Sequence, residues 1–465
     1  MQDSGHHDFD LVVIGSGPAG QHAAVLAAMH GRRVAIIERQ ELVGGVCVHT
    51  GTMPSKALRE AVLGLTGWQL RGLFPARREQ PADPVTMSDL RAHIDHVIAR
   101  EIAAIERRMS RHGVEVLFGH ARFIGTHAVE VESHRGRREA TSAAFLIATG
   151  TTARRPAWVP FDGCRVIDSD EVCSMCDLPR RMVILGGGVI ALEYASVFAL
   201  LGIEVHVVNR GARVLGFIDH DLMEVLIPVL EKRGVVFHDG AGVKGVAADS
   251  GRSPTVSLES GESIETDVVI VALGRRGTAG DLGLDAVGVT PNEDGVLSVD
   301  GSFRTSAPHI SAAGDVIGQP ATASTARNEG VRAARHLLGL PAESGEPDLL
   351  PYGIYTVPEM SYVGSTEREL ESAGTPFRAG KARYREVAKG EIIGDETGLV
   401  KLLFHRGTER LLGVHIIGSA ATDLVQLGHA VMTFCGTASY FRDAVFNYPS
   451  LSECYRIAAL DATSS

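Results

Sequence analysis

Residues 11–20 of the chain read Leu-Val-Val-Ile-Gly-Ser-Gly-Pro-Ala-Gly, and they decide the fold. The first four residues form a short apolar run, which is typical of a buried parallel strand. A Gly-x-Gly-x-x-Gly pattern follows, and residues 21–30 are rich in alanine and predict a helix. A second apolar run at 34–37 ends in Glu38. This order predicts a strand–helix–strand unit that binds a dinucleotide.

Each glycine of the pattern has a separate physical task. Gly15 permits the tight turn after the strand, and Gly17 lets the backbone approach a pyrophosphate. Gly20 allows the helix to pack closely on the strand. The pyrophosphate is expected at the helix N-terminus, where free N–H groups and the helix dipole favour an anion. Glu38 is placed to accept a hydrogen bond from a ribose hydroxyl.

The same pattern occurs a second time in the chain. Residues 182–185 read Met-Val-Ile-Leu and lead into Gly186-Gly187-Gly188, a helical segment and a strand at 205–208. Gly15 to Glu38 and Gly186 to Asn209 have the same spacing. The sequence therefore predicts two Rossmann-type units and two dinucleotides, most simply FAD in the first and a nicotinamide nucleotide in the second.

The second unit ends in Asn209, where a site selective for NAD would carry an acid, and Arg210 and Arg213 follow. Without a carboxylate, a 2′-phosphate is not repelled, and a nearby arginine can bind it. Asparagine can still bond a free 2′-hydroxyl. The second unit is therefore expected to accept both NAD(H) and NADP(H). The alternative is that both arginines are ordinary surface charges.

Composition limits the function classes. The chain has 465 residues, which suffices for about three domains. A formal charge of −11 argues against nucleic acid or an anionic membrane as the main partner. Six cysteines without a paired framework suggest a reducing compartment, and no apolar run has the length of a membrane span. The N-terminus lacks a secretion signal, so a cytoplasmic protein is expected.

Two further patterns are weak signals. His93 and His96 lie on one face of a helix expected at 90–112, but no further ligand set accompanies them, so no metal site is predicted. Cys173 and Cys176 form a Cys-x-x-Cys pair without the strand–helix context of a thioredoxin motif, and we interpret it as a chance pair in a connector. Residues from about 65 to 84 are expected to form an irregular insertion between two helices.

Residues 44–56 read Gly-Gly-Val-Cys-Val-His-Thr-Gly-Thr-Met-Pro-Ser-Lys. This segment resembles the flavin-facing segment of the pyridine nucleotide–disulfide oxidoreductases, in which two cysteines separated by four residues form a redox disulfide. Cys47 occupies the first cysteine position, but Thr52 occupies the second. Threonine cannot form a disulfide. The resemblance therefore implies a flavoenzyme that transfers hydride without passing electrons through a disulfide.

The resemblance extends over nearly the whole chain and implies its domain organisation. The segment 309–315 is similar to the strand that ends in Gly-Asp in this family, where the aspartate, here Asp315, binds the flavin ribityl chain. The expected fold class is α/β, with two Rossmann-like dinucleotide-binding domains and an α+β C-terminal interface domain that forms a homodimer. The expected domains are an FAD-binding domain (1–155 and, as a second segment, 275–345), an NAD(P)-binding domain (156–274) and an interface domain (346–465).

Within the superfamily the chain most resembles the soluble, Si-specific pyridine nucleotide transhydrogenases. The features in favour are the segment 51–59 with Thr52, Asn209, the segment 353–359, and Phe-Asn-Tyr-Pro-Ser at 446–450. Disulfide reductases carry a proton-shuttling histidine where this chain has Tyr448, whereas Glu453 keeps the position of their glutamate. Both halves of the thiol machinery are therefore altered together.

The resemblance implies that NADPH delivers hydride to flavin N5 and that NAD+ then accepts it at the same place, reversibly and with ping-pong kinetics. Lys56, paired with Glu193, is expected beside the flavin, where a cation stabilises its reduced anionic form. The alternatives are a solvated Lys56 and an ordinary surface Glu193. Cys47 is either a spectator thiol or a participant. The expected catalytic residues are Lys56, Glu193, Cys47 and Thr52.

The expected binding residues form two sets. The set for FAD comprises Gly15, Gly17, Pro18, Ala19, Gly20, Glu38, Arg39, Gly45, Val46, Cys47, Thr52, Lys56, Ala121, Thr149, Gly150, Gly314 and Asp315. The set for NAD(P) comprises Gly186, Gly188, Val189, Ile190, Glu193, Asn209, Arg210, Arg213 and Gly274.

Two rival functions remain open from the sequence. A flavin-dependent reductase of quinones or other acceptors would also lack the disulfide, because reduced flavin can pass electrons to any accessible acceptor. A redox-sensing nucleotide-binding protein would use Cys47 as an oxidisable thiol.

Overall fold

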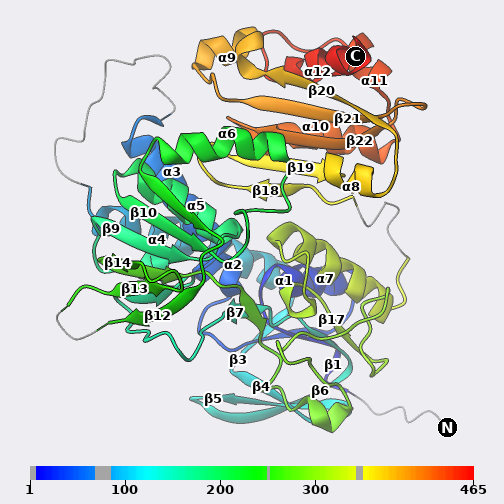
Figure 1. The fold of residues 1–465 in the computed structure, drawn as a ribbon. Coiled ribbons are helices and arrows are strands. Elements are labelled where there is room, and N and C mark those ends of the chain that lie inside the picture. The colour runs from blue at the N-terminus through cyan, green and yellow to red at the C-terminus, as the bar shows by residue number, and fades with distance from the viewer. Residues whose placement is uncertain (1–6, 69–84, 249–251, 342–348, 465) are drawn as a thin grey trace.

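The structure is a computed structural model, and it describes residues 7–68, 85–248, 252–341 and 349–464. Figure 1 shows three regions, two of them α/β and the third capping them at the C-terminal end. The predicted fold class is confirmed. Most of the segment expected as an irregular insertion and the predicted domain boundary at 345/346 lie outside the described residues.

The first region is built around β1 (Phe9–Ile14), which pairs in parallel with β2 (Val34–Glu38) and with β6 (Gly136–Ile147). Every residue of β1 and β2 except Asp10 is buried, as expected for strands covered on both faces. The other strands of this sheet are β3 (Glu115–Phe118), β4 (His120–Gly125), β5 (Ala128–Ser133) and β17 (Ile310–Ala312). Helices α1 (Pro18–Met29) and α7 (Ala323–Leu337) lie side by side (Figure 1). Helices that lie far apart in the sequence therefore complete one domain core.

The second region repeats this plan. Its parallel sheet has the order β11-β10-β9-β15-β8, and its central strand β9 (Arg181–Leu185) leads into α5 (Val189–Leu200). Its other parallel strands are β8 (Val166–Asp168), β10 (Glu204–Asn209), β11 (Val235–Asp239) and β15 (Val268–Val271). Helix α6 is His220–Glu231, and a small antiparallel sheet contains β12 (Val243–Ala247), β13 (Thr255–Leu258) and β14 (Ser263–Glu265).

The chain passes between the two regions twice, at adjacent places. Strand β7 (Thr151–Ala153) leaves the first region, and β16 (Arg275–Gly277) returns to it, and the two pair antiparallel. The predicted boundaries at 155 and 274 lie next to these two strands and stay a prediction.

The C-terminal region is an antiparallel sheet covered by helices (Figure 1). Its strands are β18 (Tyr352–Ile354), β19 (Met360–Gly364), β22 (Leu411–Ile417), β21 (Leu399–His405) and β20 (Phe377–Arg383). Its longer helices are α10 (Ala421–Thr433) and α12 (Glu453–Ser464), with α11 (Ala438–Asp443) between them. Two short helices, α8 (Glu367–Ser372) and α9 (Ala388–Ile393), lie between its strands.

Three helices connect the first region to its neighbours: α2 (Gly45–His49), α3 (Thr52–Leu65) and α4 (Met87–Arg111). Helix α3 packs against α4 and against α5 of the second region. Between the second and third regions, the fully buried Lys401 Nζ lies 2.7 Å from Asp219 Oδ1 and 2.5 Å from Asp221 Oδ2. The packing of α3 connects the first region to the second, and the ion pairs of Lys401 connect the second region to the third. No described helix is long and apolar enough to cross a membrane.

Candidate active site

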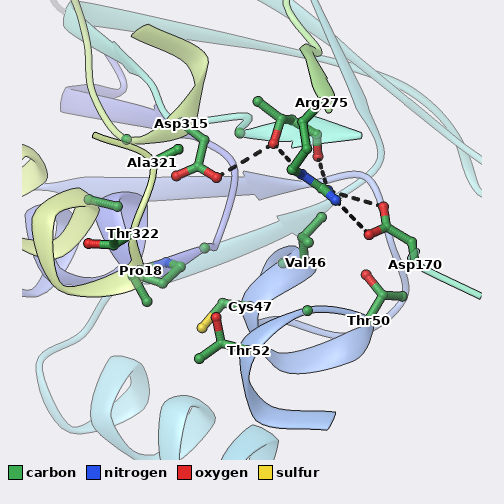
Figure 2. Close-up of a pocket in the computed structure, with 18 of the residues that line it drawn as sticks. Pro18, Val46, Cys47, Thr50, Thr52, Asp170, Arg275, Asp315, Ala321 and Thr322 are labelled. Atoms are coloured by element: carbon green, nitrogen blue, oxygen red, sulfur yellow. Dashed lines mark hydrogen bonds and ion pairs between the residues drawn. The ribbon is translucent and has the colours of Figure 1, made fainter. Parts of the chain in front are cut away.

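A cavity of about 1940 Å³ lies where the three regions meet. It is lined by the glycine-rich turns of both Rossmann-type units, by helices α2 and α3, and by residues 351–355 of the C-terminal region. Figure 2 shows part of this cavity, with Cys47 and Thr52 on one side and Asp315 and Arg275 on the other. The two predicted dinucleotide sites therefore open into one shared space.

The first unit has the backbone that a dinucleotide requires. Gly15 has φ +105°, and a Cβ there would lie 2.4 Å from Ala148 O, so no other residue fits without strain. A Cβ at Gly20 would lie 1.9 Å from Gly15 O, which shows how closely α1 packs on the preceding turn. A Cβ at Gly17, by contrast, would meet nothing within 4 Å. Gly17 therefore leaves open space at the N-terminus of α1.

Glu38 is buried and held by protein donors. Its Oε2 accepts hydrogen bonds from Ser16 N (3.0 Å) and Ser16 Oγ (2.6 Å), and its Oε1 accepts one from Gln40 N (2.9 Å). Ser16 Oγ in turn accepts a bond from Gly44 N at 2.8 Å. The acid that ends the first unit is thus connected to the loop that begins α2.

The second unit has the same turn but a different end. Gly186 has φ +125°, and a Cβ there would lie 2.3 Å from Ala272 O, whereas one at Gly188 would meet nothing. Asn209 donates from Nδ2 to Asp239 Oδ1 (2.8 Å) and to Gly211 O (3.0 Å). Arg210 lines the cavity, is 83% exposed and lies 3.3 Å from Glu259. This end of the site therefore carries an accessible positive charge.

An ion pair joins the two units at the centre of the cavity. Lys56 Nζ of α3 lies 2.7 Å from Glu193 Oε2 of α5. Glu193 Oε1 accepts a hydrogen bond from Tyr355 N at 2.9 Å, and Lys56 Nζ lies 4.8 Å from the centroid of the Tyr355 ring. The expected pairing of Lys56 with Glu193 is therefore present, and the C-terminal region orients both of its members.

Cys47 faces Thr52 rather than a second sulfur (Figure 2). Cys47 is a free thiol, as are all six cysteines, each of which lies in a described part of the chain. Burial raises the pKa of the Cys47 thiol, and a hydrogen bond with Thr52 only partly offsets this effect. The thiol is therefore protonated at neutral pH and does not supply a negative charge to the cavity.

Asp315 lies in a network that the sequence did not predict. Thr151 Oγ1 is 3.5 Å from Asp315 Oδ2, and Arg275 Nε donates to Thr151 Oγ1 at 2.8 Å. Arg275 also binds both carboxylate oxygens of Asp170, at 2.7 and 3.0 Å (Figure 2). Burial raises the pKa of Asp315. Arg275 and Asp170 both line the cavity, although Arg275 begins β16 and Asp170 follows β8.

The residues of the first unit fit a flavin dinucleotide. Gly17 and Gly150 leave space toward the cavity, since a Cβ at either would meet no atom within 4 Å. Thr149 Oγ1 is buried and has no hydrogen-bond partner among the residues that the structure describes, so it can bond a ligand group. The chain thus offers open backbone, a helix N-terminus and an unsatisfied hydroxyl in one place.

Most of the predicted binding residues line the cavity. For the first set these are Gly15, Gly17, Pro18, Ala19, Glu38, Arg39, Gly45, Val46, Cys47, Thr52, Lys56, Ala121, Thr149, Gly150, Gly314 and Asp315. For the second set they are Gly186, Gly188, Val189, Ile190, Glu193, Asn209, Arg210 and Gly274. Gly20 and Arg213 are not among the lining residues. Gly20 is buried in helix packing, and Arg213 is exposed elsewhere on the loop after β10.

Tyr448, which replaces the histidine of disulfide reductases, is 71% exposed and does not line the cavity of its own chain. Near it in the sequence, Ser450 Oγ and Glu453 Oε2 are buried and have no hydrogen-bond partner in the described part of the chain. Val445 and Phe434 are also highly exposed, at 99% and 84%. The C-terminal region therefore presents apolar side chains at its surface beside unsatisfied polar groups.

Comparisons with known proteins agree with this architecture. Residues 9–330 match the family model "Pyridine nucleotide-disulphide oxidoreductase", and residues 350–459 match its dimerisation domain. A soluble pyridine nucleotide transhydrogenase of Mycobacterium tuberculosis (strain ATCC 25177 / H37Ra) is 46% identical over 98% of this chain and 97% of its own. One of Marinobacter nauticus is 39% identical over 98% of both chains.

Among solved structures, LpdA from Mycobacterium tuberculosis is similar, with a TM-score of 0.89 and 26% identity over 97% of this chain and 99% of that chain. The Cu(II) complex of the HOCl-induced flavoprotein disulfide reductase RclA from Escherichia coli has a TM-score of 0.88 and 25% identity over 98% and 99%. The chain therefore belongs to the pyridine nucleotide–disulphide oxidoreductase family, and within it to the branch whose curated members are named soluble pyridine nucleotide transhydrogenases.

Proposed function

We propose that this flavin-dependent oxidoreductase transfers hydride reversibly from NADPH to NAD+, in two half-reactions at one nicotinamide-nucleotide site and without a redox disulfide. The observation that carries this proposal is the pair Cys47–Thr52 in the segment that faces the cavity. A disulfide reductase needs two sulfurs there. Relatives that are 39–46% identical over nearly the whole chain carry the name of transhydrogenase, which supports the same reading.

The cofactors follow from the family and from the two glycine-rich turns. FAD is assigned to the first unit, and NAD(H) and NADP(H) bind in turn at the second. When bound, FAD would supply an enzyme-held group that accepts hydride from one nucleotide and donates it to the other, which no side chain can do. The protein's own part is to bind, orient and stabilise charge.

The ion pair Lys56–Glu193 supplies the electrostatic part. Lys56 Nζ carries its positive charge into the cavity and is fixed by Glu193 and by the face of Tyr355. A fixed cation stabilises negative charge that develops during hydride transfer, and it requires no reorganisation at that moment. Because Lys56 lies on α3 and Glu193 on α5 of the second unit, the pair also connects these two helices across the cavity wall.

Use of both nucleotides is supported by the end of the second unit. Asn209 carries no charge that would repel a 2′-phosphate, and the exposed Arg210 can approach one. Among the described residues, Arg210 pairs with the exposed Glu259 at 3.3 Å, and this partner can be displaced at little cost. A ribose without the phosphate loses this contact but meets no repulsion, so both nucleotides can enter.

Assembly and location belong to the same proposal. The match of residues 350–459 to the family's dimerisation domain and the exposed apolar side chains Phe434 and Val445 support a homodimer. We assign the protein to the cytoplasm because its cysteines are all free and a reducing compartment preserves that state.

The test uses the purified, FAD-loaded protein with NADPH and thio-NAD+, followed by the absorbance of thio-NADH. Parallel reactions contain NADH with lipoamide and NADPH with a soluble quinone. We expect rapid formation of thio-NADH and no lipoamide turnover. Brisk quinone reduction with slow nucleotide exchange would overturn the transhydrogenase proposal in favour of a flavin reductase. Flavin reduction by NADPH with no productive acceptor would favour a redox sensor. Lipoamide turnover would refute the inference that Thr52, in place of a second cysteine, prevents disulfide chemistry.

A further inference from the structure

Two cysteines outside the active site lie in contact at the surface of the second region. Cys164 precedes β8, and Cys176 follows the short 3₁₀ helix η2 (Val172–Ser174). Their Sγ atoms are 3.0 Å apart, and both side chains are exposed. The pair is therefore accessible to reagents and close enough to react within the chain.

The backbone on both sides of this pair is held in place. Asp162 Oδ1 accepts hydrogen bonds from the backbone N atoms of Cys164 (2.9 Å), Arg165 (2.7 Å) and Val166 (2.8 Å). On the other side, Met175 is buried and its carbonyl oxygen accepts a bond from Arg91 Nη2. Cys164 and Cys176 thus lie next to anchored residues, which keeps the two thiols together.

The Cys-x-x-Cys spacing suggests Cys173 as the neighbour of Cys176, but the structure shows Cys164 in that place. Cys173 is partly buried against the core of the second region, and this burial raises the pKa of its thiol to about 11. A hydrogen bond connects Cys173 to the fully buried Tyr194 on α5. Cys173 is therefore an inert thiol, and Cys176 contacts Cys164, twelve positions earlier, instead.

We propose that Cys164 and Cys176 form a reversible disulfide when the protein meets a small-molecule disulfide. One thiol, as its thiolate, attacks the small disulfide, releases one small thiol and forms a mixed disulfide. The second cysteine then attacks the protein-side sulfur and releases the second small thiol, so two thiols of the protein are oxidised and one small disulfide is reduced. In a reducing compartment the pair returns to dithiol by the reverse exchange.

The position of the pair connects it to the active-site cavity. The segment between the two cysteines carries Asp170, which binds Arg275 at 2.7 and 3.0 Å on the cavity wall. It also carries Asp168 and Glu171, which bind Arg155 at 2.6 and 2.7 Å beside the crossing between the regions. A disulfide would close a covalent loop around these three carboxylates. Loop closure restricts the unfolded chain, so the thermal midpoint of the oxidised protein should rise.

The test treats the FAD-loaded protein with glutathione disulfide, blocks the remaining thiols, and combines a thiol count with peptide mapping. We expect the thiols of Cys164 and Cys176 to disappear together, with a peptide that links these two residues and no glutathione retained on either of them; the exposed Cys435 is counted separately. Dithiothreitol should restore both thiols. A stable glutathione adduct on either residue, a link between Cys173 and Cys176, or no reaction would overturn the proposal.

Three variants separate the pair from its neighbours. In Cys164→Ser, Cys176 should keep glutathione as a mixed disulfide because no second thiol resolves it, and Cys176→Ser should show the reverse. Cys173→Ser is the matched control, and it should form the same linked peptide as the wild type. Oxidation should raise the thermal midpoint by a few degrees in the wild type and in Cys173→Ser, but not in the other two variants. Equal shifts in all four proteins would contradict the assignment.

Discussion

The two Rossmann-type units differ mainly at the end of their second strand. In the first unit, Glu38 is buried and accepts three bonds from the protein, two of them from Ser16. The second unit has Gly187 at the position of Ser16, and its strand ends in Asn209 followed by the exposed Arg210. Asn209 is also buried and also makes three hydrogen bonds, so the units differ in the charge of this side chain and in the exposed arginine that follows it.

This difference explains how one scaffold can retain one dinucleotide and exchange another. In the first unit, Ser16 Oγ bonds to both Glu38 and Gly44 N. These hydrogen bonds connect the acid at the end of β2 to the segment that begins α2. In the second unit, the side chain of Asn209 bonds only within its own region, to Asp239 and Gly211. We infer that the first unit holds its ligand through many turnovers while the second releases its ligand in each half-reaction.

The largest effect should come from the glycine that both units need. We expect Gly15→Ala to be purified almost without flavin, because a Cβ would lie 2.4 Å from Ala148 O at φ +105°. The matched variant Gly186→Ala, with a Cβ 2.3 Å from Ala272 O, should keep its flavin but lose reduction by NADPH. The checks are the flavin absorbance and the rate of flavin reduction. Loss of flavin from both variants would show that the two units are not separable.

The next effect concerns the ion pair between the units. We expect Lys56→Met to lower kcat for hydride transfer by about 100- to 1,000-fold, because a fixed cation at developing negative charge is lost. Lys56→Arg should restore part of the rate, and the flavin content of both variants should stay near the wild type. Rapid-mixing measurements of each half-reaction report the effect. A loss below about threefold in Lys56→Met would mean that the pair only holds the regions together.

A smaller effect is expected when the second unit receives a carboxylate at the position that corresponds to Glu38. Asn209→Glu should lower kcat/KM for NADPH by about 10- to 100-fold through repulsion of the 2′-phosphate, with NADH much less affected. Arg210→Ala should cost NADPH about 3- to 10-fold. Arg213→Ala is the control, since Arg213 is exposed but does not line the cavity, and it should stay within about twofold. An equal loss for Arg213→Ala would show that the bound nucleotide reaches further along the loop.

The smallest effect is expected at Cys47. Its pKa is raised, so the thiol is protonated below that pKa, and the thiolate appears only at alkaline pH. Alkylation of Cys47 by iodoacetamide should therefore be slow near neutral pH and rise about tenfold per pH unit on the alkaline side. Cys47→Ser should change hydride transfer by less than about threefold, with the same pH profile between about pH 6 and pH 8. A profile that shifts with this substitution would give the thiol a part in the chemistry.

The sequence predicted what local patterns determine. Strands β1, β2, β9 and β10 and the turns between them follow from apolar runs and glycine spacing, and the repeat of the unit follows from the common distance to Glu38 and Asn209. The likeness to a known family added the pair Lys56–Glu193, whose members are 137 positions apart. The predicted fold class was confirmed because these signals agree with one another.

What the sequence could not provide are contacts between distant segments. Arg275 meets Thr151 through the pairing of β7 with β16, and it meets Asp170 because the segment after β8 lies against β7, where Asp170 Oδ2 accepts a hydrogen bond from Ala153 N. Cys176 contacts Cys164 rather than Cys173 because η2 carries Cys173 inward. Arg213 follows Arg210 closely in the chain, but the loop after β10 directs it away from the cavity lining. In each case the tertiary path of the backbone, not residue type, sets the contact.

The most direct test of the account is a grid of initial rates in which NADPH and thio-NAD+ are varied together. If one open site in the second unit serves both nucleotides in turn, the double-reciprocal lines should be parallel, and high NADPH should inhibit competitively with thio-NAD+. Intersecting lines, with both nucleotides bound at once, would contradict the proposal that a single exchanging site faces a single retained flavin.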